Sequence, residues 1–288
     1  MADLDLRPLS LGEILDRTFS LYRRNFVLFL GITALPHLLI LGMNLAQTLL
    51  IKTPAVGTPP VAAKIPNISN GLMGLGLLGA LVGIIVYLLV YLLSQGATVY
   101  AVSELYLGRS TTIGASLGRM RGQIGNLFGV TMLSGLAMMG GLILLIIPGI
   151  YIACRLITAV PAALLEDLGP RAALERSFKL TKDSAGRAFV IYLLYGILMY
   201  AAVFLFMGPF LFMVGMSVKD PAMMQGWVAA SQVGSFVGEV LVGPIFTIGA
   251  AVFYYDLRVR KEAFDLQIMM NPSGNFSPGT AGVPTTLT

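Results

Sequence analysis

One stretch of this chain occurs twice: residues 15–21 read Leu-Asp-Arg-Thr-Phe-Ser-Leu, and residues 174–180 read Leu-Glu-Arg-Ser-Phe-Lys-Leu. An acid, an arginine, a hydroxyl group, a phenylalanine and a leucine fall at the same steps in both copies, and each copy precedes a long apolar run. Around the first copy, Leu11, Ile14 and Thr18 recur at helical spacing. The repeat therefore predicts a structural unit, an amphipathic helix that leads into a membrane-spanning segment.

The composition of the whole chain requires a membrane. Of its 288 residues, 56% are hydrophobic and 11% are charged, whereas soluble domains contain about 25% charged residues. The mean hydropathy is +0.82. A chain of this composition lacks the polar groups to cover a water-exposed surface, so we expect it in a lipid bilayer.

Six apolar runs are long enough, or nearly so, for the roughly 20 residues that one span needs. The runs are residues 26–51, 71–103, 124–147, 150–165, 188–218 and 227–255. Pro148 and Gly149 separate the third run from the fourth and predict a tight turn there.

Lysines and arginines show which way the spans run. Nearly all of them lie before the first run, between the second and third, between the fourth and fifth, or after the sixth. The positive-inside rule then places both termini in the cytoplasm, with the protein in the cytoplasmic, or inner, membrane. Topology thus accounts for the net charge of +5, and we expect no nucleic-acid partner.

The repeat extends to a third place, just before the third run. Five apolar residues fall there on one predicted helical face: Ile113, Leu117, Met120, Ile124 and Leu127. We therefore predict an all-α integral membrane protein. Its six transmembrane helices form three hairpins, each preceded by a cytoplasmic amphipathic interfacial helix.

Each returning run ends with an acid that stands shortly before an arginine; the acids are Glu104, Glu166 and Asp256. A negative charge at a helix C-terminus opposes the helix dipole, so a cationic partner is expected. We predict that these acids meet arginines of the amphipathic helices, with Arg17 and Arg176 as the leading candidates. The alternative is that all three acids are solvated at the interface.

The domain organisation follows from the same pattern. Residues 1–25 are predicted to form an N-terminal amphipathic segment, and residues 26–266 the six-span membrane domain. Residues 267–288 contain proline, glycine, serine and threonine but no charge, which is typical of a disordered tail.

Arg155 and Glu239 are the clearest ionisable residues inside apolar runs. Burial of either charge alone is costly, so each needs a partner, and together they suggest a polar site for a lipid head group, an ion or a proton. The alternative is a structural ion pair, or an Arg155 side chain that extends toward water. His37 could titrate within the first span, or it could be a packing and hydrogen-bonding residue.

No catalytic set is visible. The sequence lacks a P-loop, a dinucleotide fingerprint, HExxH and GxSxG. Cys154 and His37 are the only cysteine and histidine, so the usual zinc site has no ligands. We predict no catalytic residue, no metal and no cofactor.

Four segments together resemble a known membrane family. They are Leu-Arg-Pro-Leu-Ser-x-Gly-Glu-Ile-Leu-Asp-x-Thr-Phe at residues 6–19, Ile-Pro-Gly-Ile at 147–150 with Arg155, Pro161-Ala162 with Leu165-Glu166, and Asp-Leu-Arg-x-Arg-x-Glu-x-Phe-Asp at 256–265. This set is similar to the membrane domain at the N-terminus of some glycerophosphoryl diester phosphodiesterases and to its stand-alone relatives. The resemblance implies that catalysis belongs to a separate barrel domain of about 250 residues. A short tail after the sixth run does not supply such a domain, so the activity is not carried over.

Two functions remain after these exclusions. The first is a non-enzymatic membrane protein that serves as a scaffold or regulator in the envelope. The alternative is a transporter or lipid-handling protein whose polar intramembrane site includes Arg155 and Glu239. The expected partners are the lipid bilayer and a phospholipid or another membrane protein, and no oligomeric state follows from the sequence.

Overall fold

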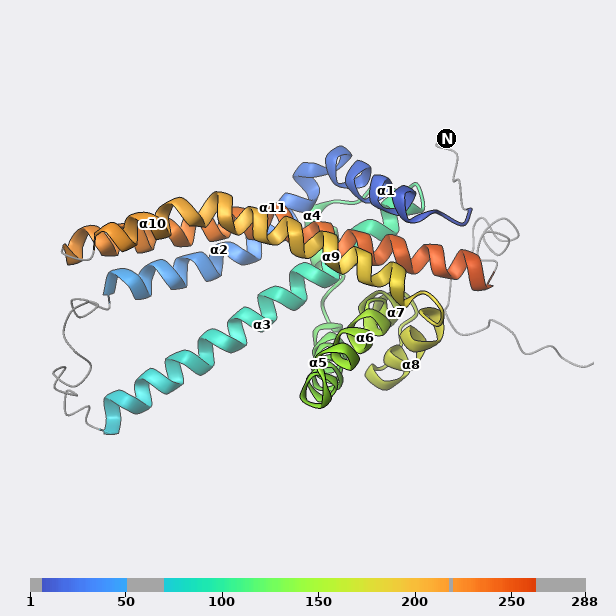
Figure 1. Cartoon of the computed structure of the whole chain (residues 1–288), viewed down its shortest axis with the longest axis horizontal. Coiled ribbons are helices and arrows are strands. Elements are labelled where there is room, and N and C mark those ends of the chain that lie inside the picture. Colours follow the sequence, from blue (N-terminus) through green and yellow to red (C-terminus); the bar gives the residue numbers. More distant parts are fainter. Residues whose placement is uncertain (1–6, 51–69, 218–219, 263–288) are drawn as a thin grey trace, which may run out of the picture. The chain divides into compact units, whose positions relative to one another are not determined.

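The computed structural model describes residues 7–50, 70–217 and 220–262, and every regular element within these ranges is a helix (Figure 1). The predicted all-α class is therefore confirmed for the described residues. The elements are α1 (Leu11–Arg24), α2 (Phe26–Leu50), α3 (Asn70–Tyr106), α4 (Ile113–Gly118), α5 (Ile124–Leu144), α6 (Ile146–Leu156), α7 (Ala159–Leu165), α8 (Pro170–Leu180), α9 (Ala185–Ala202), the π-helical turn η1 (Val203–Met207), α10 (Gly208–Met216) and α11 (Pro221–Glu262).

Six helical segments among the described residues are long and apolar enough to cross a membrane. They are Phe26–Thr48, Leu81–Tyr106, Ile124–Leu144, Ile146–Leu165, Ala185–Met216 and Ala222–Glu262. These segments correspond to the six predicted runs, and the chain is a multi-pass membrane protein. The predicted tail at residues 267–288 and the boundary at 266 lie outside the described residues.

The chain divides into two compact units. Unit 1 consists of Met1–Phe29, Gln95–Tyr195 and Pro244–Thr288, and unit 2 consists of Leu30–Ser94 and Gly196–Gly243. The divisions fall within α2, α3, α9 and α11, so these helices contribute residues to both units.

In unit 1, α1 begins at a complete capping box. The Ser10 hydroxyl accepts a hydrogen bond from the Glu13 N–H at 3.3 Å, and the Glu13 carboxylate accepts one from the Ser10 N–H at 2.6 Å. These bonds satisfy two of the N–H groups that a helix start leaves without partners. The hydrogen bonds from Ser10, together with Arg7, lower the pKa of Glu13 to about 2.

The third amphipathic segment differs from its prediction. The helix α4 comprises only six residues, and it ends at Gly118, before α5 begins at Ile124. Gly122, between them, has φ +87°, a conformation that no right-handed helix contains. The five apolar residues predicted to share one helical face therefore lie on two separate helices and the turn that joins them.

Helices α5 to α8 enclose a small core in unit 1. Its buried residues are Val130, Leu156, Ala159, Ala163 and Ala173. The helices α5 and α6 approach closely at two glycines, because a Cβ atom at Gly141 would lie 2.9 Å from the Cα of Gly149. Small residues at such crossings let helix backbones pack against each other in a membrane.

The turn between α5 and α6 lies earlier than predicted. Leu145 alone separates the two helices, and Pro148 and Gly149 lie inside α6. A proline is tolerated in the first turn of a helix, where its missing N–H would have no partner anyway. Pro148 therefore lies in the first turn of a helix here rather than in a loop, and Gly149 provides the contact with α5.

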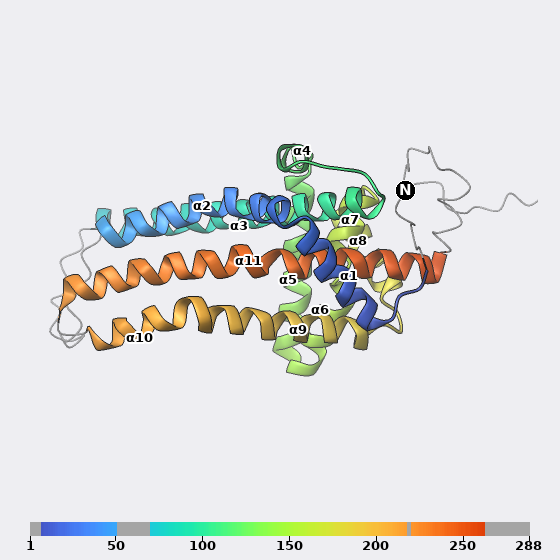
Figure 2. The same ribbon diagram turned by 90° about the horizontal axis from the view of Figure 1, so that it is seen from above.

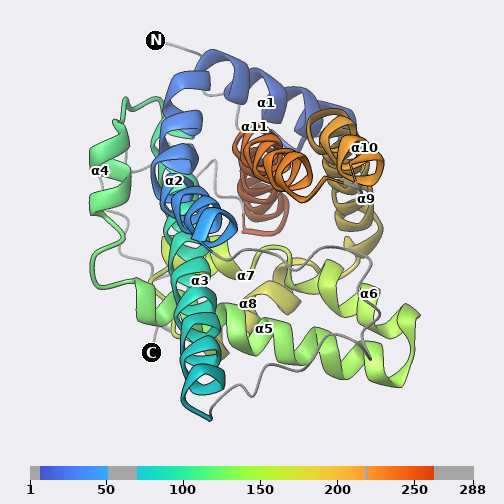
Figure 3. The same cartoon turned by 90° about the vertical axis from the view of Figure 1, so that its left-hand side faces the viewer.

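In unit 2, α11 runs between α2 on one side and α10 on the other (Figures 2 and 3). The Thr33 hydroxyl donates to the Val240 carbonyl at 3.4 Å, which joins α2 to α11. On the other side, a Cβ atom at Gly234 would lie only 2.0 Å from the Phe206 carbonyl oxygen. This close approach occurs at η1, a π-helical turn whose hydrogen bonds join residues five apart instead of four.

Candidate functional site

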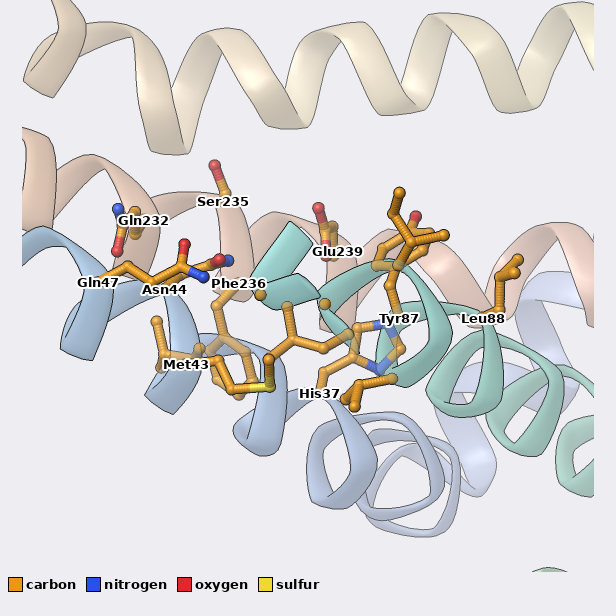
Figure 4. A pocket seen from close by; sticks show the side chains of 16 residues that line it. His37, Met43, Asn44, Gln47, Tyr87, Leu88, Gln232, Ser235, Phe236 and Glu239 are labelled. Atoms are coloured by element: carbon orange, nitrogen blue, oxygen red, sulfur yellow. The ribbon is translucent and has the colours of Figure 1, made fainter. Parts of the chain in front are cut away.

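A cavity of about 530 Å³ lies in unit 2 between α2, α3 and α11 (Figure 4). We call it the Glu239 pocket. Its polar lining residues are His37, Asn44 and Gln47 from α2, Tyr87 from α3, and Gln232, Ser235 and Glu239 from α11. All of these polar residues lie within segments that are apolar enough to cross a membrane.

Helical spacing places the lining residues of each helix on one face. On α11, Gln232, Ser235 and Glu239 follow one another at steps of three and four residues, as expected for neighbours on one helical face. On α3, Gly79 and Gly83 border open space, because a Cβ atom at either position would meet no atom within 4 Å.

Glu239 has an unusual environment for an acid inside a candidate span. Its side chain is exposed and makes no hydrogen bond or ion pair with any residue that the structure describes. Its charge interacts with His37 and Tyr87, and these three residues gather at one end of the pocket in Figure 4. Inside a membrane, a carboxylate in this position needs a proton or a positively charged partner.

His37 is held by its Nδ1 atom, which lies 2.7 Å from the Thr33 carbonyl oxygen and 3.5 Å from the Ser94 hydroxyl. A carbonyl oxygen accepts hydrogen bonds only, so Nδ1 carries a proton. In the neutral ring, Nε2 is then an acceptor.

Gln232 presents a second acceptor. Its Nε2 donates to the Thr48 hydroxyl at 2.6 Å, whereas its buried Oε1 has no hydrogen-bond partner among the described residues. Asn44 and Gln47 are exposed and lie near Gln232 at the other end of the pocket in Figure 4. The pocket therefore combines one carboxylate with several neutral polar groups.

Arg155 lies in unit 1, so it belongs to a different unit from Glu239. Its guanidinium donates to the Thr181 hydroxyl at 3.0 Å, to the Tyr151 hydroxyl at 2.8 Å and to the Phe178 carbonyl. Phe178 and Thr181 form the C-terminal end of α8, where the helix dipole favours a positive charge. A polar site shared by Arg155 and Glu239 stays a prediction.

The Arg155 backbone is attached to the same helix end. Its carbonyl oxygen accepts hydrogen bonds from the Ser177 hydroxyl at 2.8 Å and from the Thr181 hydroxyl at 2.9 Å. Side chain and backbone together therefore fix α6 to the C-terminus of α8.

Of the three acids that end the returning runs, Glu166 and Asp256 belong to networks of charged residues around α11. Arg176 Nε lies 2.7 Å from Glu166, and Arg176 Nη2 lies 2.8 Å from Glu262. The Tyr254 hydroxyl donates to Glu166 at 2.7 Å. Burial alone would lower the pKa of Arg176, but hydrogen bonds and charges from Glu262 and Glu166 raise it above its usual range.

Asp256 is completely buried and pairs with Arg187 at 2.9 Å and with Arg260 at 3.0 Å. The third acid, Glu104, pairs with Arg109 at 2.8 Å and with Arg119 at 3.0 Å. Arg17, a leading candidate from the sequence, lies over the Tyr106 ring, 4.8 Å from its centre. The three acids thus have arginine partners, of which Arg176 alone was named from the sequence.

Sequence reasoning missed most of the pocket. Tyr87, Gln232, Ser235, Asn44 and Gln47 were not singled out, although each is a polar residue in an apolar run. On α2 and α11, their spacing of three residues could have shown that they share one polar helical face. Which helical faces meet, however, depends on packing between segments almost 200 residues apart in the sequence.

Residues 127–255 match a family model described as the membrane domain of glycerophosphoryl diester phosphodiesterase. The match covers the pocket residues of α11 but not those of α2 and α3, and it concerns a membrane domain rather than a catalytic one. No curated protein and no solved structure matches the chain. The resemblance predicted from short motifs is thereby confirmed: over residues 127–255, this chain is similar to the membrane domain of glycerophosphoryl diester phosphodiesterase.

Proposed function

We propose that this multi-pass protein of the cytoplasmic membrane binds the cationic head group of an amphiphile in the Glu239 pocket. The observation that carries the proposal is the Glu239 carboxylate, which faces a polar cavity within a candidate span and has no hydrogen bond or ion pair among the described residues. This is a lipid-handling function without a catalytic step.

The chemistry of the lining favours an organic cation over an anion. The described residues that line the pocket include neither lysine nor arginine. Tyr87 and Phe236 supply aromatic rings, whose faces attract ammonium groups. A volume of about 530 Å³ lies within the range of small-molecule sites, about 300–1,000 Å³.

The proposal includes a topology. The three hairpins are α2–α3, α5–α6 with α7, and α9–α10 with α11, and each follows a helix on the cytoplasmic side, namely α1, α4 or α8. Both termini are cytoplasmic, residues 1–25 form the N-terminal segment, residues 26–266 the membrane domain and residues 267–288 the tail. The positions of the lysines and arginines in the sequence support this orientation.

A non-enzymatic scaffold or regulator of the envelope is the second candidate. The observation that favours it is that Arg155, Arg176 and Arg187 all have protein partners in unit 1. Such networks hold a surface in place for another protein. Because these three arginines already pair with groups of the protein, they do not offer a charge to a substrate.

The test is thermal unfolding of the purified protein in a neutral detergent with two added probes, dodecyltrimethylammonium and dodecyl phosphate, at equal concentrations. The ammonium probe should raise the melting temperature of the wild type, because a ligand at 100 times its Kd contributes about 2.7 kcal/mol. Glu239→Gln should lose this shift. Glu175→Gln, which removes an exposed acid on α8, should retain it.

Two outcomes would reject the proposal: equal shifts with both probes, or a full shift with dodecyltrimethylammonium in Glu239→Gln. A further arm with choline distinguishes the source of the cation. A shift with choline alone identifies a soluble quaternary ammonium ion as sufficient, whereas a shift that requires the alkyl chain identifies a membrane amphiphile.

A further inference from the structure

The tip of the α5–α6 hairpin has an apolar exposed surface. Residues 140–150 contain no polar side chain. Ile143 is 80% exposed, Leu144 77% and Ile147 81%. An exposed apolar surface of this kind fits lipid hydrocarbon rather than water.

The depth that this tip can reach depends on Arg155, ten residues after the turn. Both the guanidinium and the backbone carbonyl of Arg155 bond to the Thr181 hydroxyl, at 3.0 and 2.9 Å. Arg155 is therefore fixed at the level of the short segment that joins α8 to α9.

That segment lies among the basic residues at the C-terminus of α11. The Lys182 carbonyl, next to Thr181, accepts a hydrogen bond from the Lys261 ammonium at 2.7 Å. Lys261 and its neighbour Arg260 belong to the last turn of α11. The positive-inside rule assigns this level to the cytoplasmic boundary of the membrane, so Arg155 lies at that boundary as well.

The helix α6 is too short to cross from there. Ten residues between Leu145 and Arg155 span about 15 Å at 1.5 Å per residue, which is about half of the 30 Å hydrocarbon core. This length is an upper limit on the depth of the tip, because it assumes that α6 runs straight toward the midplane. Within unit 1, α5 runs across the C-terminal part of α11 rather than alongside it (Figure 2).

We infer that the α5–α6 hairpin does not span the membrane but inserts its tip into the cytoplasmic leaflet, where it contacts acyl chains. The partner of this surface is the hydrocarbon of that leaflet. The chain then has four crossing segments and one half-inserted hairpin, although all six segments have the length and composition of spans. The hairpin enters and leaves on one side, so the orientation of the other segments is unchanged, and the inference does not depend on the Glu239 pocket.

Site-specific labelling tests this inference in the full-length protein. Cys154 is the only cysteine, so Cys154→Ala provides a background for single cysteines. The test variant is Leu145→Cys. The controls are Met223→Cys, near the start of α11, and Glu175→Cys, on α8, which are both exposed in the structure.

A membrane-impermeant maleimide is added to sealed right-side-out vesicles and to inverted vesicles. Met223→Cys should be labelled only in the right-side-out vesicles, and Glu175→Cys only in the inverted ones. Leu145→Cys should be labelled in neither, and should react fully once the protein is unfolded in SDS. Labelling of Leu145→Cys from the Met223 side would show a true span, and labelling from the Glu175 side would show a hairpin outside the bilayer.

Quenching of a fluorophore provides a second measurement. Ile147→Cys, whose parent side chain is 81% exposed, is labelled with bimane and placed in vesicles whose lipids carry a nitroxide either near the head group or near the acyl-chain end. The inference predicts quenching by the lipid nitroxides and none by iodide added to the water, because the tip lies among acyl chains of the cytoplasmic leaflet. Quenching by iodide from either side, without quenching by the lipid nitroxides, would overturn it.

Discussion

The buried carboxylate of Asp256 accepts a hydrogen bond at 2.7 Å from the backbone N–H of Leu9, 247 residues away in the sequence. The carbonyl of Leu9 in turn accepts hydrogen bonds from Arg187 and Arg260, the two arginines that pair with Asp256. Both backbone groups of Leu9 are therefore held by one charge cluster. This cluster positions the residues that precede α1 against the C-terminal part of α11.

Replacement of Asp256 by alanine should strongly destabilise unit 1. The change removes the only acid that this cluster contains among the described residues and leaves Arg187 and Arg260 without their carboxylate. Loss of one partner of a fully buried pair costs about 3–5 kcal/mol, and we expect the lower end of that range or less because both arginines are partly exposed. Thermal unfolding in detergent measures the loss. Asp16→Ala, which removes an exposed acid on α1, should change stability by less than about 0.5 kcal/mol. Equal effects of the two variants would show that the cluster contributes nothing specific.

The capping box of α1 predicts a dependence on acid pH. Glu13 has a pKa of about 2 in the folded protein against an ordinary 4.5. A lowered carboxyl pKa contributes stability that is complete above pH 4.5 and is lost as the pH falls toward 2. The difference in melting temperature between the wild type and Glu13→Gln should thus be constant above about pH 5 and shrink below it. A difference that stays constant down to pH 2.5 would contradict the assigned hydrogen bonds.

The sequence predicted local features well and relations between segments poorly. Apolar runs and the positions of arginines are local signals, so the six segments and the paired acids could be found without a structure. The turn at Leu145 was missed because Pro148, usually a sign of a loop, here occupies the first turn of α6. The pocket was missed because its polar residues come from three helices, and helical spacing does not reveal which faces meet.

Close packing at η1 predicts a large effect of a single methyl group. A Cβ atom at Gly234 would lie 2.0 Å from the Phe206 carbonyl oxygen, so Gly234→Ala requires a backbone shift. We expect a loss of about 2–3 kcal/mol in unfolding experiments. At Gly226, on the same helix, a Cβ atom would meet nothing within 4 Å, so Gly226→Ala should be neutral or stabilising by up to about 1 kcal/mol. Similar losses in both variants would indicate that helix propensity, not packing, governs this segment.

Arg155 separates the structural interpretation of the intramembrane charges from the functional one. Arg155→Gln loses most of the hydrogen bonds to Tyr151, Phe178 and Thr181, and hydrogen bonds of a charged group contribute about 1.5–3 kcal/mol each. The melting temperature should therefore fall clearly. Because these partners belong to unit 1 and the Glu239 pocket to unit 2, the Kd for dodecyltrimethylammonium should remain within about twofold of the wild-type value. Equilibrium dialysis at a temperature where both proteins are folded measures that Kd. A tenfold change, about 1.4 kcal/mol, would instead favour a single polar site that includes both Arg155 and Glu239.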